Sequence, residues 1–123
     1  MSAPINFTDL NTWQTAHQIV IAIYKITDKF PARDAFGIAS QMQRSALSVT
    51  SNIAEGFGRQ QTNDKLHFYT MARGSLTELE NQLLAAGDVG RINAAQCKVL
   101  TDKVITVHKL LYVLMRSTKK GAS

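Results

Sequence analysis

The sequence predicts an all-α protein, an antiparallel up-down-up-down four-helix bundle that forms one domain over residues 1–123. Four long segments carry apolar residues in steps of three and four, and no segment alternates as a strand does. Only two prolines interrupt the chain, and its length suffices to bury one core. The short connections between the segments favour antiparallel neighbours.

The first predicted helix spans about residues 9–29, with Thr8 or Asp9 as its N-cap. Phe30 ends it, because a residue before proline is displaced from helical geometry. Its apolar residues cover more than one face: Trp13, Ala16, Val20, Ile23, Tyr24 and Thr27 on one side, widened by Ile19, Ala22, Ile26 and Phe30. We expect burial of this surface against another copy of the chain, although the bundle alone could cover it.

The second predicted helix spans about residues 36–55, with Gly56 and Gly58 as terminators. A polar stripe runs beside its apolar side at about 100° per residue: Gln41, Arg44, Ser48, Asn52, Glu55 and Arg59. These side chains either make hydrogen bonds and ion pairs within the bundle or between subunits, or present Arg44 and Arg59 to phosphate. The structural interpretation is preferred, because a carboxylate in the same stripe partly neutralises the arginines.

The third predicted helix spans about residues 63–87, after Thr62 as N-cap. Gly74 lies opposite its core seam, where it costs roughly 1 kcal/mol relative to alanine. Gly74 and Ser75 are candidates for a position at which another helix approaches closely. Alternatively, Gly74 is a surface glycine that the helix tolerates. Glu78 extends the polar stripe and could face Glu55 across the two helices.

The fourth predicted helix spans about residues 94–117 and leads into a polar tail, residues 118–123. Gly90 marks a tight turn, and Asn93 with Gln96 has the spacing of a capping box. Cys97 lies in the apolar seam of this helix and is expected to pack as a small hydrophobe.

The net charge of +5 is concentrated in this last helix and tail. Residues 1–97 contain eight basic and eight acidic residues, whereas six basic residues and one acidic residue follow, so that 6 − 1 = +5. Basic side chains interleaved with an aromatic ring suit contact with a nucleic-acid backbone and its bases. The candidates for nucleic-acid contact are Lys98, Lys109, Tyr112, Arg116, Lys119 and Lys120. A solvated face that serves only solubility is the alternative.

No catalytic, cofactor, metal or small-molecule substrate site is predicted, and we expect a protein that is not an enzyme. His17, His67 and His108 lie on different helices without metal-ligand spacing, and phosphate-loop and GxSxG motifs are absent. The apolar runs are shorter than the roughly 20 residues of a membrane span, which argues against a membrane partner. A lone cysteine and an N-terminus without signal-peptide features favour a cytoplasmic location.

Three segments carry a family resemblance: Arg44-Ser45-Ala46, residues 52–56 (NIAEG), and residues 72–79 (ARGSLTEL). In this order, after a first helix ending in FP, the chain resembles the bacterial four helix bundle protein family over about residues 7–114. This family is also called the ribosomal RNA intervening-sequence protein family. The family motif residues present here are Gln41, Arg44, Asn52, Glu55, Gly56, Gly74, Ser75 and Glu78.

The resemblance implies an antiparallel four-helix bundle that assembles into a ring-like homopentamer. Family members are encoded within insertions in large-subunit ribosomal RNA genes or stand alone in bacterial genomes. A related branch comprises the accessory proteins of diversity-generating retroelements, which bind a reverse transcriptase and nucleic acid. Two functions follow as hypotheses: an oligomeric scaffold or adaptor that binds RNA, DNA or a nucleic-acid enzyme, or a protein-binding ring without affinity for nucleic acid.

Overall fold

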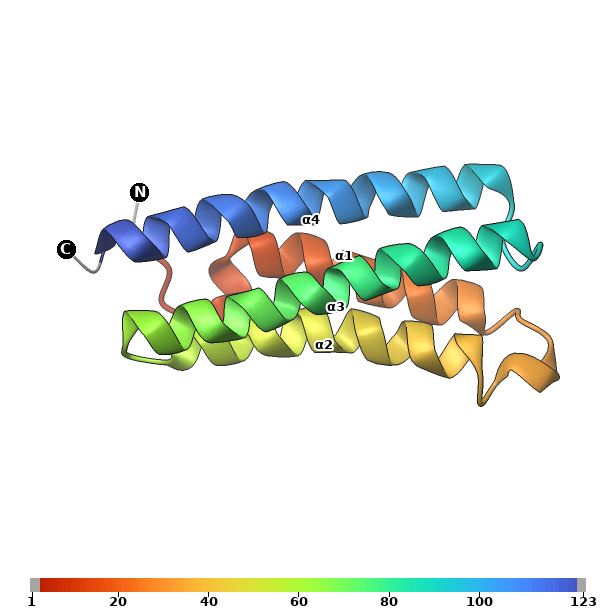
Figure 1. The fold of residues 1–123 in the computed structure, drawn as a ribbon, viewed down its shortest axis with the longest axis horizontal. Coiled ribbons are helices and arrows are strands. Elements are labelled where there is room, and N and C mark those ends of the chain that lie inside the picture. The colour runs from red at the N-terminus through yellow and green to blue at the C-terminus, as the bar shows by residue number, and fades with distance from the viewer. Residues whose placement is uncertain (1–2, 122–123) are drawn as a thin grey trace.

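The structure, a computed structural model, describes residues 3–121 and contains four long antiparallel helices (Figure 1). They are α1 (Asn11–Thr27), α2 (Ile38–Gly58), α3 (Thr62–Asp88) and α4 (Ala94–Gly121). Two 3-10 turns, η1 (Phe7–Asp9) and η2 (Ala32–Asp34), precede α1 and α2. No strand occurs in the described part of the chain. The predicted all-α four-helix bundle is confirmed.

Each helix packs against two neighbours, in the order α1, α2, α3, α4 and back to α1. Ile23, Ile53, Leu79 and Val107, one from each helix, are fully buried in the shared core. Burying an aliphatic side chain of this size contributes roughly 1.5–3 kcal/mol relative to leaving it exposed. The apolar spacing of the sequence therefore defines one closed core, and the polar faces point outward.

α2 and α3 approach each other closely at Gly56, through which α2 continues to Gly58. A Cβ atom at this position would lie 2.6 Å from Cε1 of Tyr69, whose ring is buried. Gly56 is therefore a packing residue, and the prediction that it terminates the helix is wrong. At Gly74, by contrast, a Cβ would meet nothing within 4 Å. No described helix of the same chain approaches Gly74, so its predicted role remains a prediction for contacts between copies.

The helix boundaries differ from those predicted where local capping is involved. Asn6 caps η1 and forms a capping box with Asp9, so α1 begins only at Asn11. α3 begins at Thr62 itself, with Gln61 as N-cap and no side-chain cap. α4 extends to Gly121, beyond the predicted end at residue 117, and residues 122–123 of the expected tail lie outside the described residues. Lys119 and Lys120 in its last turn interact favourably with the helix dipole.

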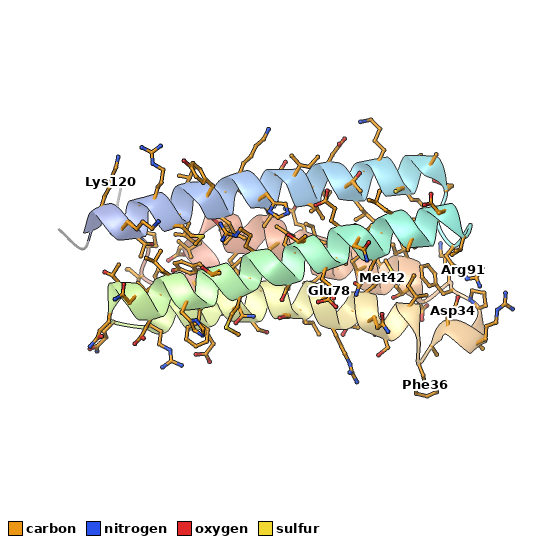
Figure 2. All side chains as sticks on the ribbon, in the orientation of Figure 1. Asp34, Phe36, Met42, Glu78, Arg91 and Lys120 are labelled. Atoms are coloured by element: carbon orange, nitrogen blue, oxygen red, sulfur yellow. The ribbon has the colours of Figure 1, made fainter. Side chains whose placement is uncertain are left out.

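The connections at one end of the bundle are fixed by specific contacts. The backbone N–H of Asn93 donates to the side chain of Gln96 (2.9 Å), and the N–H of Gln96 donates to the side chain of Asn93 (2.8 Å), which confirms the predicted capping box. Gly90 turns the chain with φ of 80°. Arg91 in this turn forms an ion pair with Asp34 in the α1–α2 connection (Figure 2). This ion pair fastens the two connections to each other.

Candidate functional site

The outer face of α4 presents basic side chains around an exposed aromatic ring. Lys109, Arg116 and Lys119 are exposed, and Tyr112 is 61% exposed. This face lies opposite the seam of Leu100, Val104, Val107 and Leu111, which packs into the core. Figure 2 shows Lys120 projecting away from the bundle near the C-terminal end of the helix.

The acidic residues near this face leave most of its positive charge in place. Asp102, the only acidic residue of α4, accepts a hydrogen bond from Lys98 at 3.2 Å, and both side chains are well exposed. Glu80 of α3 contacts α4 on another side, where its carboxylate lies 3.5 Å from Nε2 of His108. The charge of Lys98 is therefore locally balanced, and the half of α4 beyond Asp102 contains no carboxylate side chain.

Part of the predicted polar stripe on α2 joins this helix to α3. The hydroxyl groups of Ser48 and Ser75 are 2.7 Å apart. The Asn52 amide donates to the Ser48 backbone carbonyl at 2.8 Å and to its hydroxyl at 3.1 Å. These three residues form a hydrogen-bonded contact inside one protomer, which explains why amides and hydroxyls occupy these positions.

The remainder of the stripe faces solvent. Gln41, Arg44 and Glu78 line a shallow depression between α2 and α3, floored by Ser45, Ser48 and Ser75. Arg44 makes no hydrogen bond or ion pair with any residue in the described range 3–121. One turn beyond Glu78, the buried Gln82 donates to that carboxylate at 3.4 Å, while its own Oε1 accepts no hydrogen bond from the residues that the structure describes. Arg44 thus retains hydrogen-bonding capacity at the depression that one protomer does not use.

Glu55 and Arg59, at the C-terminal end of the polar stripe, form an ion pair apart from the depression that Glu78 lines. Arg59 and Glu55 make the predicted i,i+4 ion pair at 3.2 Å, and the Arg59 guanidinium lies 4.6 Å from the ring centroid of Phe68. Glu55 lines a depression with Phe7, away from the one that Glu78 lines. The two glutamates therefore do not share a site, and the expectation that they could face each other is wrong.

The surplus apolar surface of α1 is only partly covered by the bundle. Ile19 and Ile23 are buried, but Ala22 and Ile26 line an open groove between α1 and α4. The α4 side of this groove consists of Ala95, Val99 and Leu100, with Gln96 and Lys103 at its margin. The groove exposes only apolar surface.

The histidines and the cysteine have structural surroundings. The His17 ring stacks on Trp13 with centroids 4.5 Å apart. Cys97 is half-buried against the core, with Sγ 3.8 Å from the carbonyl oxygen of Leu83. Among residues 3–121, no three His, Cys, Asp or Glu side chains are grouped as metal ligands would be. None of the helices in the same range is long and apolar enough to span a membrane.

Lys65 and His108 make side-chain contacts that were not predicted from the sequence. Lys65 donates to the carbonyl oxygens of Phe57 at 2.7 Å and Gly56 at 3.4 Å, so that it caps the end of α2 from the first turn of α3. His108 pairs with Glu80 between α3 and α4. Both contacts join different helices, and helical periodicity alone gives no sign of such partners.

Comparison with known proteins identifies similarity in sequence and in fold. The profile of a family described as 23S rRNA-intervening sequence protein matches residues 8–113. A 1.70 Å crystal structure of a protein with unknown function from the S23 ribosomal protein family of Bacteroides thetaiotaomicron VPI-5482 has the same fold, with a TM-score of 0.79. It is 19% identical in sequence, and the alignment covers 85% of this chain and 95% of that one. No curated protein matches the chain.

Proposed function

Because this chain belongs to the 23S rRNA-intervening sequence protein family, we propose that it is a non-enzymatic, homo-oligomeric scaffold that associates with RNA through the outer face of α4. DNA, or an enzyme that acts on nucleic acid, is an alternative partner for the same face. The reference to rRNA in the family description makes ribosomal RNA the first ligand to test. A cytoplasmic location would agree with the unpaired thiol of Cys97.

The observation that carries this proposal is the exposed Tyr112 ring between Lys109 and Arg116 on a helix face whose only carboxylate is already paired with Lys98. Basic side chains that neutralise phosphates release condensed counterions, and an exposed ring offers a stacking surface to unpaired bases. Such a face binds nucleic acid with little dependence on sequence and strong dependence on salt.

Unused surfaces of the protomer suggest self-association, and self-association would strengthen RNA binding. The groove between α1 and α4 and the polar depression between α2 and α3 both offer contacts that one protomer leaves unused. A homo-oligomer also multiplies the charge of α4: five copies, as in the homopentamer implied for the family, would carry 5 × 5 = +25. Several weak contacts on one RNA raise avidity without any new interaction.

A non-enzymatic role is part of the proposal because the polar residues do not converge as catalytic residues do. The Ser48 and Ser75 hydroxyls contact each other and Asn52, with no histidine among these partners. His17 stacks on Trp13, and His108 pairs with Glu80 on another side of the bundle. Nucleophilic catalysis requires a nucleophile and a base within hydrogen-bonding distance, and these groups do not form such a pair.

A salt titration of RNA binding tests the proposal. The triple change Lys109→Glu, Arg116→Glu and Lys120→Glu should weaken binding to 23S rRNA fragments in a filter assay. It should also make the slope of log K against log salt shallower by roughly 2, as expected for the loss of three contacts to single-stranded phosphates.

The matched control is Lys25→Glu, Lys29→Glu and Arg73→Glu, which produces the same net charge, 5 − 6 = −1, with exposed residues of α1, α3 and the α1–α2 connection. The control should retain more affinity and a steeper slope than the α4 variant. Equal losses in the two variants would mean that net charge alone matters and would refute a binding face on α4.

A protein-binding ring without nucleic-acid affinity is the second candidate. Ile105 and Val113 are exposed along the outer side of α4 close to its basic residues, which suits contact with another protein. This function predicts no measurable binding of RNA or DNA at physiological salt in the same titration.

A further inference from the structure

Phe36 exposes the whole of its aromatic ring. Its relative accessibility is 101%, the highest of the large apolar residues in the range 3–121, and Figure 2 shows the side chain projecting away from the α2 side of the bundle. A phenylalanine side chain can bury about 150–250 Å² in a contact. An aromatic ring that is displayed in this way is typical of an anchor residue in a protein interface.

The segment that carries Phe36 is held by hydrogen bonds and an ion pair. The N–H of Gly37 donates to the carbonyl of Asp34 at 3.0 Å, and the N–H of Ala35 donates to that of Ala32 at 3.1 Å. The Asp34 carboxylate is fixed by Arg91 from the α3–α4 turn. An anchor on such a segment loses less conformational entropy when it binds than one on a loose loop.

The groove between α1 and α4 provides a surface of matching character on the same chain. Ala22 and Ile26 form one wall, Val99 and Leu100 the other, and the small side chain of Ala95 leaves space between them. Lys103 lies at the margin, where its ammonium group donates to Gln18 at 3.4 Å. An aromatic ring that enters this groove meets apolar surface within and a cation at the edge.

Ring and groove lie at the same end of the bundle but on different sides. The groove is built from the second half of α1 and the first turns of α4, and Phe36 precedes α2, which lies across the bundle from α4 (Figure 1). Because Phe36 is fully exposed, it does not occupy the groove of its own chain. A second copy placed beside the first could therefore insert its Phe36 ring into the groove of the first copy. The groove of the second copy would remain available to a third copy.

We propose that Phe36 of one copy packs into the α1/α4 groove of the next copy. The inference rests on the self-association in the proposed function and specifies the contact that produces it. Such a contact is heterologous, since different surfaces of the two subunits meet, and repetition of one contact builds a closed ring or an open filament.

Two variants test the two sides of this contact separately. Phe36→Ser removes the ring, and Val99→Glu places a carboxylate in the groove, one turn from Lys103. Val99 is 55% exposed and glutamate is a good helix former, so the fold should persist; circular dichroism and thermal unfolding check this. Matched controls are Leu84→Glu, at a leucine of α3 that is 51% exposed, and Ile5→Ser, at a residue that is 89% exposed near the other end of the bundle.

Sedimentation velocity should show an oligomer for the unchanged chain and for both controls. Each test variant alone should be monomeric, with the association constant lowered by at least about 30-fold, as for an interface anchor. An equimolar mixture of the two variants should form a heterodimer, because the Val99→Glu chain contributes the ring and the Phe36→Ser chain contributes the groove.

The remaining outcomes contradict the inference in distinguishable ways. If Phe36→Ser still assembles like the unchanged chain, the contact is wrong but self-association stands. If both variants are monomeric and the mixture gives no heterodimer, the ring and the groove are not each other's partners. If the unchanged chain is itself a monomer, the self-association in the proposed function fails together with the inference.

Discussion

Gly56 is the residue at which the smallest chemical change should have a large effect on the fold. Gly56→Ala would place a methyl group 2.6 Å from the Tyr69 ring, which is held in the core. Overpacking of this kind costs about 1–3 kcal/mol, partly offset by the better helix propensity of alanine. We expect a lower free energy of unfolding in urea denaturation.

The same substitution at Gly74 is the matched control. No other helix of the same protomer lies within 4 Å of the added Cβ there, so Gly74→Ala should stabilise the fold of one protomer by up to roughly 1 kcal/mol through helix propensity. Equal effects at the two positions would contradict the assignment of the close helix approach to Gly56.

Tyr69 makes stability depend on pH in the alkaline range. Burial raises the pKa of Tyr69 from 10.0 to about 12, so the folded chain keeps the phenol neutral where the unfolded chain has lost its proton. The free energy of unfolding is therefore unaffected by this group below pH 10. It falls by up to about 3 kcal/mol as the pH rises towards 12, because the unfolded chain loses the phenol proton first. Tyr69→Phe keeps the ring but removes the proton. The difference in unfolding free energy between the two proteins should therefore change over this interval, and a constant difference would contradict the assignment.

At the scale of elements, the start of α4 depends on the reciprocal bonds of Asn93 and Gln96. Asn93→Ala removes the side-chain cap and should lower the free energy of unfolding by about 1 kcal/mol. Asn81→Ala, at an exposed asparagine within α3, is the control and should have little effect or stabilise slightly. The capping account fails if thermal unfolding shows the reverse order of the two variants.

Features that depend on residues close in sequence were predictable, and those that join distant segments were not. The four helices, the capping box and the Glu55–Arg59 pair follow from spacings of three or four residues. The Asp34–Arg91 ion pair links residues 57 positions apart, and the Ser48–Ser75 contact spans 27. These partners depend on how the helices pack, which one sequence does not specify.

The same distinction explains which parts of the candidate site could be predicted from the sequence. The basic stripe of α4 could be predicted because residues such as Lys109 and Arg116 repeat along a single helix. The α1/α4 groove could not, because Ala22 and Val99 become neighbours only in the folded bundle. Only the surplus of apolar residues on the first helix indicated that such a surface would exist.

For the whole molecule, assembly and charge are connected. One chain presents a modest basic face, whereas a ring or filament that repeats the contact between Phe36 and the groove would repeat that face in every subunit. RNA affinity should therefore fall when assembly is blocked, even though the residues of α4 are unchanged. The scaffold function that we propose would thus depend first on self-association.

Sedimentation equilibrium of the purified chain at micromolar concentration tests this self-association. We expect one species whose mass is a whole multiple of that of the chain, five-fold if the chain forms the homopentamer that the family resemblance implies. A mass equal to that of a single chain at every concentration would contradict it.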